Sequence, residues 1–169
     1  MIRLLPVFML LLVAPAPSMA VDLFAATGAW QGEGRLATGP EAPLVRGRCR
    51  VEITPDPGAG ALDLVGRCAV AAGMSDISVK LVRTPGGAVR AGVWSAATGQ
   101  TVQYAGAESG AKIALTAAAP LDLDGRIYES RVEVTAPDGP SFAVRQLLRA
   151  SGETAWRVVA EMTYRPAGG

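Results

Sequence analysis

Residues 48–70 read RCRVEITPDPGAGALDLVGRCAV, and this stretch decides the fold class. On both sides of the PDPGAG segment, apolar residues alternate with mostly polar ones, which is the two-residue period of a β-strand. The segment itself, residues 55–60, consists of the Pro, Asp and Gly residues that favour turns, with one interspersed Ala. The stretch therefore predicts a β-hairpin. Its directly opposed pairs are Ile53 and Leu64, Val51 and Gly66, and Cys49 and Cys68.

The chain has two cysteines, and the predicted hairpin places Cys49 directly opposite Cys68. Opposed residues of antiparallel strands have Cα atoms about 4.5 to 5.5 Å apart, which a disulfide can bridge. A redox-active pair is the alternative, but such pairs are usually closer in sequence, as in Cys-x-x-Cys. We therefore predict a structural disulfide.

The N-terminal segment has the three parts of a secretory signal peptide. Arg3 provides the positive charge, residues 4–13 form a short apolar run, and Ser18-Met19-Ala20 is a small-x-small cleavage site. The run is shorter than the roughly 20 residues of a membrane-spanning helix, so a retained anchor is the weaker alternative. We predict a signal peptide over residues 1–20, cleavage after Ala20, and a periplasmic or secreted domain over residues 21–169. Such a compartment is oxidising and suits the disulfide.

Two-residue alternation continues to the end of the chain, and no segment has convincing helical periodicity. The further predicted strands are residues 29–36, 77–83, 89–94, 101–105, 111–117, 127–135, 142–149 and 155–164. One helical turn fits residues 23–29, and residues 117–125 read as a longer loop. About ten short strands with tight turns predict an all-β domain. Its predicted form is a single antiparallel up-and-down β-barrel of about 8–10 strands, because a sandwich, the alternative, usually needs longer connections.

Composition excludes several classes of function. The 169 residues include no His, so imidazole bases, imidazole metal ligands and His-ligated haem are excluded. A net charge of +1 lacks the basic surplus that nucleic-acid binding needs. Asp122 and Asp124 lack the remaining ligands of a calcium loop and read as a polar turn. We expect no catalytic residues, no metal site and no cofactor.

The predicted strands at 127–135 and 142–149 have an apolar inward face that carries two polar residues, Ser130 and Gln146. The predicted register pairs Val134 with Phe142, Ser130 with Gln146, and Tyr128 with Leu148. Buried polar groups need partners. Ser130 and Gln146 either bond to each other or orient a ligand in the lumen, and both interpretations stay open.

Four aromatic residues fall on predicted inner faces: Trp30, Tyr128, Phe142 and Trp156. They either plug the ends of the barrel or line a cavity, which small alternating Ala and Gly residues would leave unfilled. The candidate ligand-binding residues are Trp30, Tyr128, Ser130, Phe142, Gln146 and Trp156.

The first predicted strand begins Gly28-Ala29-Trp30 and continues through Gln31 to Gly32-Glu33-Gly34. This pattern resembles the opening of calycin barrels, the group of lipocalins, fatty-acid-binding barrels and nitrobindin-like barrels. The resemblance implies that Trp30 closes one barrel end, with Arg145, Arg149 or Arg165 packing over it. The haem site of nitrobindin-type barrels is not implied, because their ligating His is missing, and the lipocalin Thr-Asp-Tyr signature is also absent.

The sequence therefore predicts an exported, non-catalytic carrier or sensor that binds a small apolar or amphipathic ligand in its lumen. The main alternative is a solidly packed scaffold, interaction protein or inhibitor whose outer surface, for example around Trp94, meets a protein partner. An enzyme that uses a carboxylate on a lumenal substrate is a weaker third hypothesis. No integral membrane segment is expected after signal cleavage, and no protein partner is identified.

Overall fold

The computed structural model describes residues 22–136 and 140–168, so the predicted signal peptide at 1–20 lies outside the described residues. A short 3₁₀ helix, η1 (Leu23–Ala25), precedes the strands, where the sequence predicts a helical turn. The strands are β1 (Gly28–Ala37), β2 (Leu44–Asp56), β3 (Ala61–Val70), β4 (Gly73–Arg83), β5 (Ala88–Ser95), β6 (Gln100–Ser109), β7 (Lys112–Ala117), β8 (Leu121–Leu123), β9 (Arg126–Thr135), β10 (Phe142–Ala150) and β11 (Arg157–Pro166).

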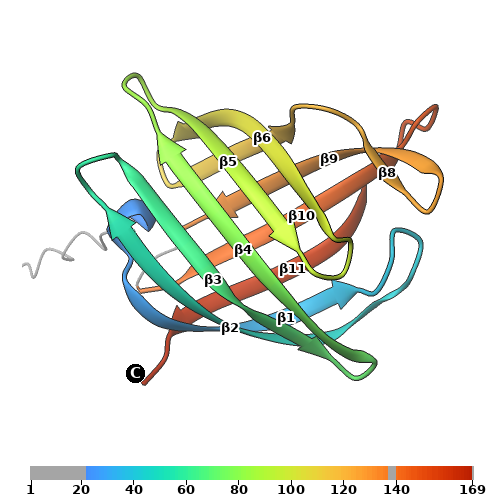
Figure 1. The fold of residues 1–169 in the computed structure, drawn as a ribbon, viewed down its shortest axis with the longest axis horizontal. Coiled ribbons are helices and arrows are strands. Elements are labelled where there is room, and N and C mark those ends of the chain that lie inside the picture. Colours follow the sequence, from blue (N-terminus) through green and yellow to red (C-terminus); the bar gives the residue numbers. More distant parts are fainter. Residues whose placement is uncertain (1–21, 137–139, 169) are drawn as a thin grey trace, which may run out of the picture.

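Ten of these strands close into an antiparallel barrel (Figure 1). Each strand from β1 to β7 pairs with the next, β7 pairs with β9, and β10 and β11 complete the ring back to β1. The short strand β8 continues the ladder beside β9, within the segment that was expected to be a loop. The prediction of an all-β, up-and-down barrel is confirmed, and the architecture is consistent with a calycin-like barrel.

The hairpin of β2 and β3 has the register that the sequence predicts. Ile53 pairs with Leu64, Val51 with Gly66, and Cys49 with Cys68. The two cysteines form a disulfide, with their Cα atoms 4.0 Å apart. A disulfide is typical of proteins in oxidising compartments.

The predicted register of β9 and β10 is wrong by two residues. Val134 pairs with Val144 rather than with Phe142, and Ser130 pairs with Leu148 rather than with Gln146. A shift of two residues leaves every side chain on its predicted face, because side chains alternate with a period of two. Alternation alone therefore cannot distinguish the two registers.

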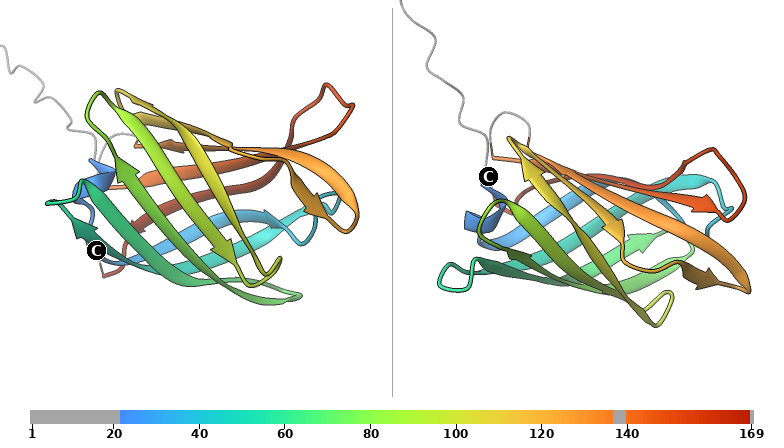
Figure 2. Two further views of the ribbon diagram at one scale, coloured as in Figure 1. Left: turned by 45° about the horizontal axis from the view of Figure 1, so that its top comes forward. Right: turned by 90° about the horizontal axis from the view of Figure 1, so that it is seen from above.

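One end of the barrel, here called the plugged end, carries η1 and the loops at 57–60, 84–87 and 110–111. Figures 1 and 2 show η1 lying against this end. Inside it, the Phe142 ring stacks on Tyr164 with centroids 4.8 Å apart, and Trp30 packs on Phe142 at 5.1 Å. All three side chains are buried. These aromatic rings fill the lumen at the plugged end.

An ion-pair bridge holds η1 onto the plugged end. The guanidinium of Arg83 in β4 donates to Asp22 at 2.8 Å and to Glu108 of β6 at 2.8 Å. Its carbon also lies 4.1 Å from the centre of the Phe24 ring, a cation–π contact. The hydrogen bond from Arg83 lowers the pKa of Asp22. The same guanidinium therefore joins η1, β4 and β6.

A glycine in β1 makes room for the aromatic plug. A Cβ atom on Gly32 would lie 2.6 Å from the ring of Tyr164, closer than carbon atoms can approach. Tyr164 is the residue opposite Gly32 in the β1–β11 register. The Gly-x-Gly of the opening motif thus permits close packing of Tyr164 over the strand. Across the described residues, no helix is long and apolar enough to cross a membrane.

Candidate functional site

The opposite end, here called the open end, carries the loops at 38–43, 71–72, 96–99 and 151–156. In β3 and β5, inward-facing side chains lose burial toward it, whereas Tyr128 of β9 and Leu148 of β10 stay buried at this end. In β3, Leu62 is 1% exposed, whereas Leu64, the next inward residue, is half-buried. In β5, Val89 is likewise 1% exposed and Val93 is half-buried. In these two strands, the inward side chain nearer the open end is therefore less completely covered.

The half-buried part of the inward face is largely apolar. Half-buried hydrophobic residues from eight of the ten barrel strands pack against the core: Leu36, Leu64, Cys68, Ile77, Val79, Val93, Val102, Ala117, Val132 and Val144. Most are small or branched aliphatic side chains. A concave apolar surface with few polar groups is the usual chemistry of a small-molecule site.

One polar cluster interrupts this surface, formed by Tyr104, Ser130 and Gln146. The Tyr104 hydroxyl lies 2.9 Å from Ser130 Oγ, and Gln146 Nε2 donates to Ser130 at 3.4 Å and to Tyr104 at 3.5 Å. Ser130 is 0% exposed, whereas Gln146 is half-buried. Burial raises the pKa of Tyr104, against the hydrogen bonds from Ser130 and Gln146, so its hydroxyl stays protonated at neutral pH. The cluster is uncharged.

Three strands supply this cluster, and β7 separates two of them. Tyr104 in β6 pairs with Ala117 at the end of β7, and Ser130 lies beyond it on β9. The short side chain of Ala117 does not block the phenol, which reaches over it to Ser130. Gln146 approaches Ser130 diagonally, because its direct partner in β9 is Val132. The predicted contact between Ser130 and Gln146 therefore exists, in a different register.

The disulfide lies in the wall opposite the polar cluster. Around the ring of ten strands, the boundary between β2 and β3 is five strands away from the boundary between β7 and β9. Both Cys49 and Cys68 belong to the core, Cys49 buried and Cys68 half-buried. The accessible lumen thus has a cross-linked wall on one side and a hydrogen-bonded wall on the other.

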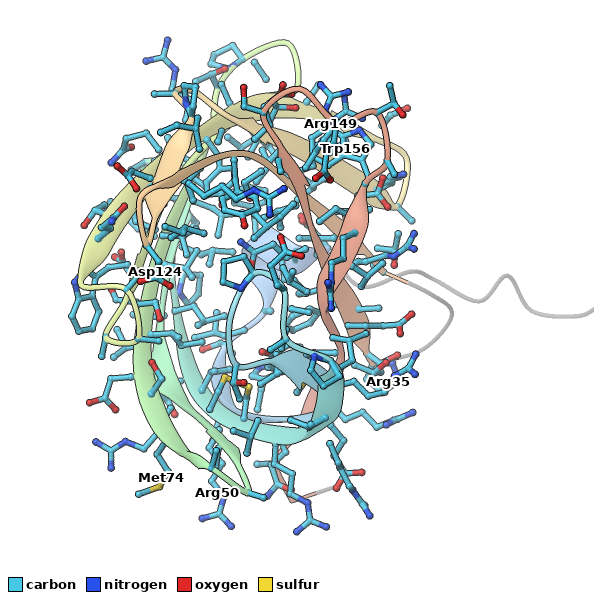
Figure 3. All side chains as sticks on the ribbon, turned by 90° about the vertical axis from the view of Figure 1, so that its right-hand side faces the viewer. Arg35, Arg50, Met74, Asp124, Arg149 and Trp156 are labelled. Atoms are coloured by element: carbon cyan, nitrogen blue, oxygen red, sulfur yellow. A yellow bond between two sulfur atoms is a disulfide. The ribbon has the colours of Figure 1, made fainter. Side chains whose placement is uncertain are left out.

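The loop at 38–43 partly covers the open end. Its Glu41 carboxylate accepts the Tyr128 hydroxyl at 2.9 Å, Arg126 at 3.2 Å and Arg157 at 3.4 Å. Arg157 also donates to the Ala42 carbonyl at 2.7 Å. Figure 3 looks into this end and shows the loop in front of the barrel interior. The loop is therefore held against β9 and β11 by the Glu41 carboxylate and the Ala42 carbonyl.

The structure separates the six predicted site residues. Ser130 and Gln146 meet in the polar cluster, and Tyr128 lies at the open end beneath Glu41. Trp30 and Phe142 belong to the plug at the other end, where Trp30 Nε1 donates to the Thr27 carbonyl at 3.1 Å. Trp30 therefore occupies the barrel end that the resemblance implies.

The placement of Trp156 on an inner face is wrong. Its ring lies between the guanidinium groups of Arg131 and Arg149, at 4.1 and 4.8 Å, on the outer surface, and Figure 3 shows it beside Arg149. Strand β11 begins only at Arg157, and the ladder with β10 is irregular beside Leu147. The inward–outward alternation of side chains in the middle of β11 therefore does not extend back to Trp156.

The expected arginine over Trp30 is also absent from the residues that the structure describes. Arg149 stacks on Trp156 instead. Arg145 and Arg165 are exposed on the outside of their strands. The aromatic ring at the plugged end that does carry a cation is Phe24, under Arg83.

Tyr104 is the member of the polar cluster that the sequence did not reveal. It lies between Val102 and Gly106 on the inward face, but the outward residues nearby include Ala105 and Ala107, which blur the alternation. The strongest signal for it was the inward Ser130, a buried hydroxyl that needs a partner. The pair Asp122 and Asp124, which the sequence places in a polar turn, is a separate point. Asp122 accepts a hydrogen bond from the Gly125 amide at 2.9 Å, as expected of such a turn.

A comparison with models of known protein families and a search of curated protein sequences both find no match to this chain. The likeness to calycin barrels therefore rests on the architecture and on the short Gly-x-Trp motif.

Proposed function

We propose that this protein is an exported carrier or sensor that holds a small, largely apolar molecule in the open half of its barrel, without chemical conversion. One observation carries the proposal: half-buried aliphatic side chains surround the lumen at the open end, next to the Tyr104–Ser130–Gln146 cluster. Binding of an apolar ligand to such a surface is favourable, because the ligand replaces water in contact with apolar side chains.

The two ends of the barrel support this use. The aromatic plug closes one end, so a ligand has a floor to rest on. The loop at 38–43 covers part of the other, so a ligand has an entrance that can be restricted. The predicted signal peptide and the disulfide fit a periplasmic or secreted carrier.

An interaction protein is the second candidate, favoured by one feature of the outer surface. Val65 pairs with Ser78 in β4, and Ser78 pairs with Trp94 in β5, so these three residues form one row across the outside of the barrel. Val65 is 58% exposed and Trp94 is 37% exposed. A protein partner would cover this row and leave the lumen without a role.

Binding of the uncharged fluorescent probe N-phenyl-1-naphthylamine tests the proposal. We expect the mature wild-type protein to bind it, and a Val93→Trp variant to fold normally but lose binding, because the indole occupies the open lumen. The control is Thr101→Trp, which adds the same ring at an exposed outward position.

The opposite pair of results contradicts the proposal. A lumen that side chains already fill gives no binding by the wild type, and Val93→Trp then lowers the melting temperature strongly through overpacking. Native mass spectrometry of protein purified from its own host adds a second measurement, since a co-purifying small molecule identifies the ligand directly.

A further inference from the structure

Building on the proposed carrier function, we infer that the lumen selects an uncharged ligand, an apolar body with one hydrogen-bond donor such as a hydroxyl, and that Gln146 Oε1 accepts that donor. This names the class of ligand and the residue that recognises it. Three features of the barrel carry the inference.

The first feature is the placement of charge. Between the plug and the open end, the inward-facing residues of the described strands carry no charged side chain. The ion pairs of the strands lie across the outer face, for example between Lys80 and Asp63 and between Arg149 and Glu129. Arg83 and Glu108 lie beside the plug, and each has the other as a partner. An ionised ligand would have no counter-ion inside, and burial of an unpaired charge is strongly unfavourable.

The second feature is the state of the polar cluster. The Tyr104 and Ser130 hydroxyls bond to each other, and the Nε2 group of Gln146 donates to both. Gln146 Oε1 has no partner among the residues that the structure describes, and it is not among the side-chain atoms buried without one. It is therefore a carbonyl acceptor with some exposure to solvent, and a ligand hydroxyl or amide N–H can replace that solvent.

The third feature concerns the open end, where a fatty-acid-like ligand would place its carboxylate if it entered tail first. The cations beside the covering loop are Arg126 and Arg157, and both already bond to Glu41. A ligand carboxylate there would compete with Glu41 and lie close to its negative charge. Neither end of the accessible lumen therefore favours an anion.

Displacement of bound N-phenyl-1-naphthylamine by three ligands with ten-carbon chains tests the inference: 1-decanol, decyl methyl ether and decanoate. Measurements at about pH 8 keep decanoate ionised. We expect 1-decanol to displace the probe at concentrations at least about tenfold lower than decanoate, with the ether, which lacks a donor, between them.

Variants of the amide locate the recognition. Gln146→Leu is expected to remove the preference for 1-decanol over the ether, with the affinity of the probe measured again for the variant because its amine N–H can also bond to Gln146. Gln103→Leu, the same change at an exposed outward position of β6, is expected to leave the preference intact. Gln146→Met keeps the length of the side chain and replaces Gln146→Leu if that variant has a lowered melting temperature.

The outcomes separate the two proposals. Decanoate that binds as tightly as 1-decanol, or an unchanged preference for the alcohol in both Gln146 variants, overturns the inference and leaves a lumenal carrier. Failure of wild-type protein to bind the probe and all three ligands overturns the proposed function itself.

Discussion

The two halves of the barrel are built from the same alternating strands but differ in what fills them. At the plugged end, Trp30, Phe142 and Tyr164 pack ring against ring, and aliphatic residues such as Ile53 and Leu62 are 1% exposed. In the open half, aliphatic residues such as Leu64, Val79 and Val93 are only half-buried, while a second, smaller core forms around Tyr128 and Leu148. Side-chain volume at the inward positions, rather than the strand pattern, therefore distinguishes the two halves.

The open half adds other means of support to its smaller core around Tyr128 and Leu148. The disulfide between Cys49 and Cys68 joins β2 to β3 in its wall. Glu41 joins the covering loop to β9 and β11 through Tyr128, Arg126 and Arg157. Exposed ion pairs contribute little each, so the cross-link is the stronger of the two supports.

The largest expected effect comes from the same substitution, Leu to Ala, made once in the plugged half and once in the open half. Leu62→Ala removes a fully buried side chain beside the plug and should lower the free energy of unfolding by about 3 to 5 kcal/mol. Leu64→Ala, two residues further along β3, removes a half-buried side chain and should lower it by about 1 to 2 kcal/mol. Urea unfolding of both variants measures the difference. Equal losses would mean that the lumen is packed at both positions.

Loss of the disulfide is expected to have the next largest effect. The two cysteines are 19 residues apart, and a disulfide that closes a loop of this size stabilises a protein by about 3 kcal/mol. The double variant Cys49→Ala, Cys68→Ala should therefore unfold at lower urea concentration. Its backbone amides should become exchangeable first in the open half. Hydrogen exchange measures this order, and faster exchange beginning in β10 and β11 near Phe142 would contradict it.

Alkaline pH should act on the plugged end. Burial raises the pKa of Tyr164 to about 12, whereas an unfolded tyrosine titrates near 10. The folded state holds the proton more tightly, so this contribution to stability is complete below about pH 10 and disappears as the pH rises toward 12. The full loss is about 2 to 3 kcal/mol.

Tyr164→Phe provides the control, because it keeps the ring and removes the titrating group. The variant should lose less stability than the wild type between about pH 10 and pH 12 in urea unfolding. Parallel curves for the two proteins would show that the Tyr164 hydroxyl is not buried in the plug.

The sequence was sufficient to predict the fold, because polar–apolar alternation and turn residues act locally. The register of β2 and β3 was also predictable, since the short PDPGAG turn joins them and the two cysteines agree with it. The register of β9 and β10 was not, because a shift by two residues preserves both faces and the connection between them is longer.

The candidate site was predictable in part, for similar reasons. Ser130 and Gln146 stood out as polar residues on an apolar face, and the structure brings them together. Tyr104 joins them from β6, a contact that crosses β7 and depends on the pairing of β7 with β9 and on the short side chain of Ala117. Trp156 was misplaced because a strand start and a ladder irregularity interrupt the alternation near it.

Methyl NMR with a small neutral nitroxide in solution tests directly whether solvent enters only one half of the lumen. The nitroxide broadens the signals of methyl groups that it can approach. We predict strong broadening for Leu64, Val79 and Val93 and protection for their strand neighbours Leu62, Leu81 and Val89. Equal protection of all six residues would contradict the account, because it would mean that the barrel is filled from end to end.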